Sequence, residues 1–221
     1  MFIEDPRRHG LKYNPFKALV VPRPIGWISS VDLEGCANLA PYSFFNAVAD
    51  VPPMVCFSPN NPGIGRARKD TLENIEKTNC FVVNFCHYDL RHQMNMSAAH
   101  VPPETDEFAL AGLTPVPSVK VRAPRMKEAR ASLECEFMFR LRLPSESPSI
   151  ENNVVFGKVV GIHIADEIIA DGKVDIRLYR PIARLGYMDY ALIAESFAMD
   201  RPDDNTELRE KRLLSTLPNK L

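Results

Sequence analysis

The chain has 221 residues, 45% of them hydrophobic and 25% charged, which suits one sizeable domain with an ordinary buried core. A net charge of -1 argues against a protein that binds nucleic acid or anionic lipid by electrostatic attraction. We also expect no membrane span, because Asp50 and Pro52 interrupt the longest apolar run. Residues 1–13 lack the apolar segment of a secretory signal, so we expect a cytoplasmic protein.

Prolines mark the edges of many short apolar runs, because proline lacks the N–H that a sheet ladder needs. Between them, β-branched and aromatic residues predict strands at 24–31, 38–45, 53–58, 80–85, 133–142, 154–165 and 176–186. Residues 81–85 are apolar nearly throughout, which is typical of a strand buried on both faces. The turns at 32–35 and 170–173 predict hairpins, in which Gly35 and Gly172 supply a positive φ.

Helices are fewer than strands. We expect them at residues 70–78, 89–99, 190–199 and from 203 or 205 to 214. Asp70 or Thr71 is predicted to cap the first of them. Many strands with few helices predict a mainly β barrel with helical additions. We expect residues 1–200 to form this domain, and residues 201–221 to form a helical C-terminal extension.

The five cysteines form no Cys-x-x-Cys pair and mostly stand in apolar segments, which predicts reduced core thiols rather than disulfides. His87, His92 and His100 lie near Cys80 and Cys86, but these spacings match no common zinc site. We therefore predict no metal, and we interpret the histidines as surface or helix-capping groups. A Cys–His nucleophilic pair is an alternative that the residues leave open.

Two other candidate motifs do not indicate a functional site. Residues 63–65 form a Gly-x-Gly, but no third glycine follows at the spacing of a dinucleotide-binding turn. Glu134 and Glu136 alternate along a predicted strand, and we interpret them as a solvated or dimer-facing edge. The residues alone offer no side-chain nucleophile, metal cluster or acid–base pair. We predict no catalytic side chain, so a cofactor must carry any chemistry.

Two longer segments carry a family resemblance. Residues 23–30 read Arg-Pro-Ile-Gly-Trp-Ile-Ser-Ser, and residues 38–45 read Asn-Leu-Ala-Pro-Tyr-Ser-Phe-Phe. Further matching segments stand at residues 52–55, 69–75, 81–84, 106–108, 111–114 and 133–135. In their order and spacing, from about residue 15 to 200, they resemble the flavin reductase-like family, which includes flavoredoxin and the reductase components of two-component monooxygenases.

The resemblance implies an FMN-binding split β-barrel that forms a homodimer, with FMN in a groove near the subunit interface. It implies a phosphate end built from Ser29, Ser30, Ser58, Lys69, Asp70 and Thr71. It places the flavin ring against the backbone of Asn38, Leu39, Ala40, Pro41, Tyr42 and Ser43. Trp27 and Ser97 are further candidates for cofactor contacts. The alternative is structural: the serines end strands, Thr71 caps a helix, and Trp27 fills the core.

The implied reaction is NAD(P)H-dependent reduction of flavin, with FMN passing electrons to a monooxygenase or another redox partner. Three alternatives remain: a flavoredoxin-like carrier reduced by a protein, a different chemistry on an aromatic or phosphorylated substrate, and a flavin-binding module without turnover. His163 lies on a predicted strand and faces either the nicotinamide or the outside.

Overall fold

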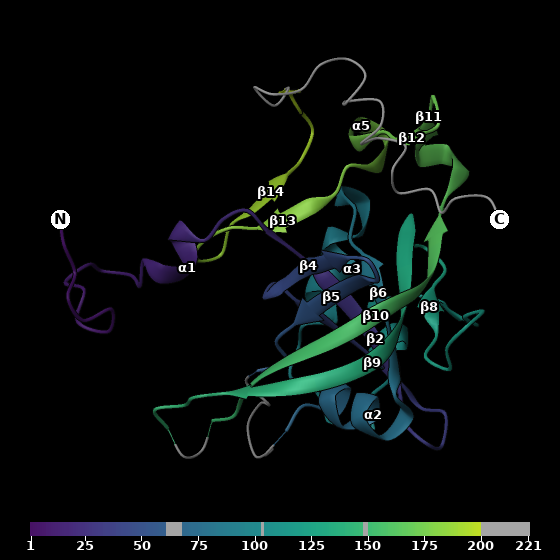
Figure 1. Cartoon of the computed structure of the whole chain (residues 1–221), viewed down its shortest axis with the longest axis horizontal. Helices are drawn as coiled ribbons and strands as arrows, with labels where there is room; N and C mark the ends of the chain where they lie inside the picture. Colours follow the sequence, from purple (N-terminus) through teal and green to yellow (C-terminus); the bar gives the residue numbers. More distant parts are fainter. Residues whose placement is uncertain (61–67, 103, 148–149, 200–221) are drawn as a thin grey trace.

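The computed structural model describes residues 1–60, 68–102, 104–147 and 150–199. Within these ranges, the main element is one antiparallel sheet of seven strands (Figure 1). The strands lie in the order β3 (Ala37–Tyr42), β2 (Gly26–Val31), β6 (Cys80–Phe85), β9 (Ala131–Leu143), β10 (Asn152–Ile164), β5 (Pro53–Phe57) and β4 (Phe45–Asp50). The prediction of a mainly β protein is confirmed.

The sheet curls into a barrel because its two edge strands are consecutive in the chain. β3 ends at Tyr42 and β4 begins at Phe45, so only Ser43 and Phe44 link the opposite edges of the sheet. In the part of the chain that the structure describes, these two edges form no ladder with each other. The barrel is therefore split at this seam. The sequence predicted one strand over residues 38–45, and the break at the seam corrects that prediction.

Aromatic side chains fill the inside of the barrel. The rings of Phe57 and Phe81 have centroids 5.3 Å apart, and Tyr42 lies 5.1 Å from Phe57. Both phenylalanines are fully buried. Gly157 on β10 leaves the space that the Phe81 ring occupies, since a Cβ there would lie 2.3 Å from Phe81 Cζ.

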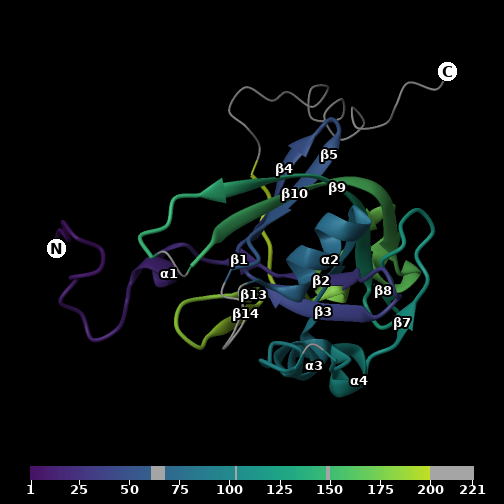
Figure 2. The same ribbon diagram turned by 90° about the horizontal axis from the view of Figure 1, so that it is seen from below.

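Helices cover the outside of β2, β3 and β6. α3 (Arg91–Met96) and α4 (Glu107–Ala111) lie beside β3 (Figure 2), and their Met94 and Phe108 share a buried cluster with Trp27. α2 (Asp70–Thr78) packs against β2 from the inner side, because its Leu72 and Ile75 belong to the buried cluster that contains Phe57 and Phe81. These strands are thus buried on both faces, as the apolar runs predicted.

The remaining elements are short. They are the strands β1 (Arg23–Pro24), β7 (Pro115–Val116), β8 (Arg125–Met126), β11 (Ile169–Ala170), β12 (Lys173–Val174), β13 (Ile182–Arg184) and β14 (Tyr190–Leu192), with the helices α1 (Phe16–Leu19) and α5 (Ile176–Tyr179). β1, β13 and β14 form a second small sheet. Both predicted hairpin turns are confirmed, with φ of 99° at Gly35 and 72° at Gly172. None of the helices in the described ranges is long and apolar enough to cross a membrane.

Three predicted elements, at residues 176–186, 190–199 and 89–99, need correction. The strand expected at 176–186 begins as α5, because the Asp175 side chain caps it by accepting from the Arg177 N–H. The helix expected at 190–199 is wrong, because its first residues pair with β13 as β14. The helix predicted at 89–99 is shorter, with a 3-10 turn followed by α3. The extension 201–221 lies outside the described residues.

The predicted cap of α2 is also wrong. Lys69 occupies the N-cap position, and its side chain makes no capping hydrogen bond. The Thr71 hydroxyl donates instead to the Asn38 side chain at 2.6 Å. The Thr71 hydroxyl therefore contacts β3 and does not cap the helix as predicted.

Candidate functional site

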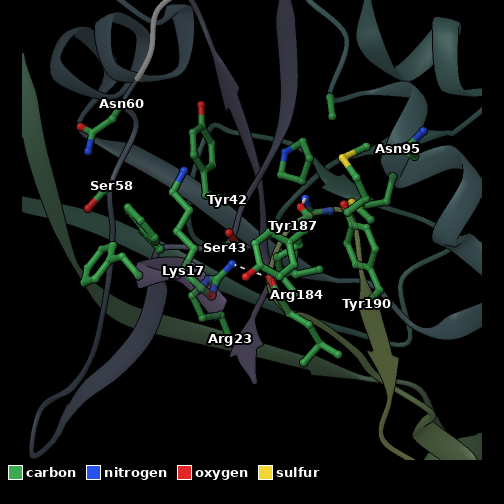
Figure 3. A pocket seen from close by; sticks show the side chains of 18 of the residues that line it. Lys17, Arg23, Tyr42, Ser43, Ser58, Asn60, Asn95, Arg184, Tyr187 and Tyr190 are labelled. Atoms are coloured by element: carbon green, nitrogen blue, oxygen red, sulfur yellow. Dashed lines mark hydrogen bonds between the residues drawn. The ribbon is translucent and has the colours of Figure 1, made fainter. Parts of the chain in front are cut away.

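A cavity of about 700 Å³ opens at the seam of the barrel (Figure 3). Pro41, Tyr42, Ser43 and Phe44 line it from the link between β3 and β4. The N-terminal segment around α1 and the turn between β13 and β14 form the other walls. A volume of this size is typical of sites for small molecules.

The polar side chains of the cavity lie at its two ends and along one wall. In Figure 3, Ser58 and Asn60 stand at one end, while Asn95 and Tyr190 stand at the other. Lys17, Arg23 and Arg184 lie between them. The cavity thus combines aromatic and aliphatic surface with hydroxyl, amide and cationic groups.

Arg23 holds the cavity walls together. One of its terminal nitrogens donates to the carbonyls of Lys17 and Val20 at 2.5 and 2.6 Å, and the other donates to Leu185 at 2.9 Å. The guanidinium therefore ties the segment that contains α1 to the turn after β13. The same two segments also pack closely against each other, because a Cβ at Gly186 would lie 2.5 Å from Ala18 Cβ.

The three cations give the cavity a positive potential. Burial, together with the charge of Arg184, lowers the pKa of Arg23, although an arginine stays protonated at neutral pH. Among the described residues, no carboxylate forms an ion pair with Lys17, Arg23 or Arg184. The Nε of Arg23 is buried without a hydrogen-bond partner. An anionic ligand with hydrogen-bond acceptors fits this combination.

A buried polar network supports the seam from behind. The Tyr42 hydroxyl donates to the Thr71 hydroxyl at 2.9 Å, and Thr71 donates to Asn38 Oδ1. Asn38 Nδ2 donates to Glu107 Oε1 at 3.0 Å, and the Leu39 N–H donates to Glu107 Oε2 at 3.3 Å. The donors all point from the cavity wall toward Glu107. Its carboxyl therefore orients the strand that reaches the cavity.

Burial raises the pKa of Glu107, and the nearby charge of Asp70 raises it further. Burial also raises the pKa of Tyr42, which keeps its hydroxyl protonated at neutral pH. Glu107 belongs to the segment 106–108 that carries the family resemblance, but no feature of the sequence predicted a role for its side chain.

The sequence profile of the flavin reductase-like domain matches residues 18–183. The chain belongs to this family. An uncharacterized protein from Aquifex aeolicus is 41% identical over 175 residues, covering 79% of this chain and 86% of the relative. Among solved structures, nitrilotriacetate monooxygenase component B from Bacillus cereus is 33% identical, with a TM-score of 0.80 over 90% of this chain and 98% of that one.

Other solved structures agree on the fold. The 2-nitrobenzoate 2-nitroreductase NbaA from Pseudomonas fluorescens is 27% identical, with a TM-score of 0.73 over 85% of this chain and 89% of that one. Flavoredoxin from Desulfovibrio vulgaris (Miyazaki F) is 18% identical, with a TM-score of 0.71 over 83% of this chain and 93% of that one. The predicted family and fold are confirmed, and membership supports a flavin-related oxidoreductase role.

The structure brings part of the predicted flavin reductase-like site to the cavity. Pro41, Tyr42, Ser43 and Ser58 line it. Leu39 is fully buried in the core, and Ala40 packs against the inner cluster of the barrel. Sequence reasoning missed Lys17 and Arg184 as cavity residues, although Arg23 begins the segment that carries the resemblance.

The other predicted hydroxyl groups have partners inside the chain. Ser29 Oγ donates to the Pro124 carbonyl at 2.5 Å, and Ser30 Oγ donates to Asn38 Oδ1 at 3.3 Å. Both serines are fully buried and do not line the cavity. Lys69 and Asp70 stand at the start of α2, next to residues 61–67, which lie outside the described ranges. A phosphate contact for these four residues stays a prediction.

Trp27 and Ser97 form a buried pair. Trp27 Nε1 donates to Ser97 Oγ at 2.9 Å, and Ser97 donates in turn to the Met94 carbonyl at 3.0 Å. Neither residue lines the cavity in this chain. The structure gives both a core role, which was the alternative that the sequence left open for Trp27.

Glu134 corrects another interpretation. It is fully buried rather than at a solvated edge, and it accepts from the N–H groups of Val119 and Lys120 at 2.8 and 2.5 Å. His163 Nε2 lies 2.5 Å from the same carboxylate and does not line the cavity. Although burial opposes ionisation, these hydrogen bonds lower the pKa of Glu134 overall. The pair thus orders the loop before β8.

The cysteines supply no reactive group to the cavity. None of the five lines it, and none forms a disulfide. Burial raises the pKa of Cys86 to about 12, so this thiol stays protonated at neutral pH. The described residues contain no group of three or more potential metal ligands.

Proposed function

We propose that this chain binds FMN in the seam cavity and works as an NAD(P)H-dependent flavin reductase. The observation that carries the proposal is a cavity with aromatic walls and three cations, none of which forms an ion pair with a carboxylate of the described residues. FMN combines a flat apolar ring with a phosphate, so both halves of the molecule find matching groups. The buried and unpartnered Arg23 Nε supports an acceptor-rich ligand.

The residues divide between these two halves of the ligand. Ser58 and Asn60 would hold polar groups at one end of the cavity, and Lys17, Arg23 and Arg184 would favour its negative charge. The backbone of Pro41 to Ser43 would contact the ring. When bound, FMN would take a hydride from NAD(P)H and deliver electrons to an acceptor. The chain itself orients the ligands and sets the local potential.

The proposed acceptor is a monooxygenase or another redox partner. Support comes from the relative of known structure that is 33% identical and is the B component of a monooxygenase. The flavoredoxin-like carrier is the alternative, in which a protein rather than NAD(P)H reduces the flavin. The two differ in whether a nicotinamide nucleotide alone can reduce the bound flavin.

We also propose that the chain forms a homodimer through the outer face of β9, β10 and β5. Val55 and Phe57 point into the barrel, so Cys56 between them points outward. In the same row across the sheet lie Phe156 and Phe139, whose rings stack at 4.7 Å. Phe139 remains half-exposed in the single chain. An exposed aromatic side chain of this kind is expected on a surface that a second copy of the chain covers.

The test is spectroscopic. The purified protein is titrated with FMN by flavin fluorescence, and NADH or NADPH is then added without oxygen. We expect saturable binding and bleaching of the flavin absorbance. A flavin that binds but stays oxidised would favour the carrier. Protein that neither carries nor binds FMN would overturn the proposal.

Arg184→Gln tests the cations directly. Loss of a charge-assisted hydrogen bond to the ligand should weaken FMN binding by about tenfold or more. Arg142→Gln is the control, because Arg142 lies on β9 away from the cavity and its side chain is exposed. Equal FMN affinity in the two variants would contradict a role for the cations.

A further inference from the structure

A second cavity of about 230 Å³ adjoins the first. The two share Met94, Asn95 and Tyr190 as walls, so the second lies at the end of the seam cavity opposite Ser58 and Asn60 (Figure 3). The proposed flavin site does not account for this space. It is built from the 3-10 turn before α3, from α3 itself and from β13 and β14.

The walls of the second cavity suit a single aromatic ring. Ile182, Ala191, Leu192 and Met94 provide aliphatic and thioether surface, and Tyr190 adds an aromatic face. Apolar cavities of about 150 Å³ are large enough to hold benzene. The measured space therefore admits one substituted ring but not a dinucleotide.

Among the residues that line this cavity, Arg91 carries a positive charge and none is acidic. The Arg91 guanidinium lies 4.1 Å from the ring centroid of Tyr88 and donates to its carbonyl at 3.0 Å. Within the described ranges, no carboxylate forms an ion pair with Arg91. Asp89 is the nearest acidic residue in sequence, but Arg130 and Arg180 already share it at 3.4 and 3.5 Å.

This local charge decides the class of ligand. Arg130 and Arg180 share the carboxylate of Asp89, and Arg130 also pairs with Glu167 at 3.0 Å, so these charges balance, whereas Arg91 adds a positive charge beside an apolar space. His92, the other ionisable group on the cavity wall besides the tyrosines, cannot supply a negative charge. A small ring that carries a carboxylate would match both the apolar walls and the unpaired guanidinium.

We propose that the second cavity binds a small aromatic carboxylate next to the flavin site. Arg91 holds the carboxylate, and the ring lies among Ile182, Leu192 and Tyr190. The location of this site beside a flavin rests on the proposed function. Binding of the aromatic carboxylate does not depend on flavin. The site would thus give the protein a second ligand, either an electron acceptor or an effector.

Benzoate is the probe, and isothermal titration calorimetry is the measurement. We expect benzoate to bind both the flavin-free protein and the protein saturated with FMN. Benzamide has the same shape without the charge, and it should bind at least about tenfold more weakly. Failure of benzoate to bind at millimolar concentration, or equal binding of benzamide, would overturn the inference.

Two variants of the cavity and one control locate the site. Arg91→Gln removes the charge and Leu192→Trp fills the space, and each should weaken benzoate binding about tenfold or more while FMN binding persists. Arg142→Gln should bind benzoate as the natural chain does. Circular dichroism verifies that each variant is folded, and the two cavity variants act by different means.

The same set of titrations separates this site from the seam cavity. Benzoate that is displaced by FMN, or that responds to Arg184→Gln and not to Arg91→Gln, would lie in the first cavity and would overturn the inference. Absence of FMN binding would contradict the proposed function instead. In that case, benzoate binding to the flavin-free protein would still decide whether the second site exists.

Discussion

Arg23 shows why one residue type is required at the cavity wall. Its guanidinium presents donors in a fixed planar fork, which lets it reach carbonyls of two separate segments at once. A lysine ammonium keeps the charge but is a compact group on a flexible stem. Shape and charge at this position can therefore be tested separately.

Arg23→Lys should destabilise the fold although the charge remains. The variant leaves carbonyls of Lys17, Val20 or Leu185 without their donor, so we expect the free energy of unfolding to fall by about 1–3 kcal/mol. Urea denaturation measures the change. Arg142→Lys, on the exposed hairpin, should change it little. Equal effects in both variants would refute the role of Arg23 as a clamp between the segment that contains α1 and the turn after β13.

Gly157→Ala tests the packing inside the barrel. The added Cβ would meet Phe81 Cζ at 2.3 Å and Cε1 at 2.6 Å, within the closely packed core. We expect a loss of about 1–3 kcal/mol from overpacking. Gly161→Ala on the same strand is the matched control, because its Cβ would lie 3.5 Å from Glu134, an ordinary contact. Thermal unfolding of the two variants should differ clearly.

At the level of elements, Glu107 couples α4 to β3. It accepts from the Asn38 side chain and from the Leu39 backbone, and so it holds the strand that ends at the cavity. Its raised pKa means that the folded chain binds this proton more tightly than the unfolded chain does. This contribution to stability is present below the unfolded pKa and is lost as pH rises through the folded pKa.

Glu107→Gln should remove this pH dependence. The glutamine is neutral at all pH values and keeps one acceptor oxygen for the network. We therefore expect the stability advantage of the natural chain over the variant to shrink as pH rises above the ordinary range of a glutamate. Urea titrations from pH 5 to 8 measure it. An advantage that grows with pH would contradict the assignment.

The sequence predicted strands well where several apolar residues run together. β2, β5, β6, β9 and β10 are recovered, because their patterns reflect burial that any barrel of this kind requires. The seam between β3 and β4 was missed, since Ser43 and Phe44 do not differ in propensity from a continuing strand. The α5 helix was missed because its cap, Asp175, is a signal of a single residue.

The candidate site was only partly predictable for a different reason. Pro41 to Ser43 and Ser58 belong to segments whose spacing carries the resemblance. Lys17 and Arg184 come from opposite ends of the domain, and only the folded chain brings them together. Buried serines and cavity serines also look alike in sequence, so Ser29 and Ser58 could not be told apart there.

At the level of the whole molecule, the outer face of the long hairpin of β9 and β10 carries the proposed dimer contact. Leu141 on β9 is about half-exposed, and it pairs across the ladder with Val154. Leu141→Glu should place a charge within the proposed dimer contact, so we expect a dimer to become a monomer in sedimentation velocity. Leu33→Glu, at an exposed hairpin turn, should leave the dimer intact. A natural chain that sediments as a monomer would contradict this interface.

The Arg23 clamp also fixes when the cavity can exist during synthesis. One wall contains Lys17, which precedes every strand of the barrel in the chain, and the other contains Arg184 and Tyr190, which follow all of them. Domains generally fold as units while the chain is made. A nascent chain that stops before residue 184 has a complete large sheet and no closed cavity. Capture of a ligand at the seam therefore comes only after the whole barrel has been synthesised.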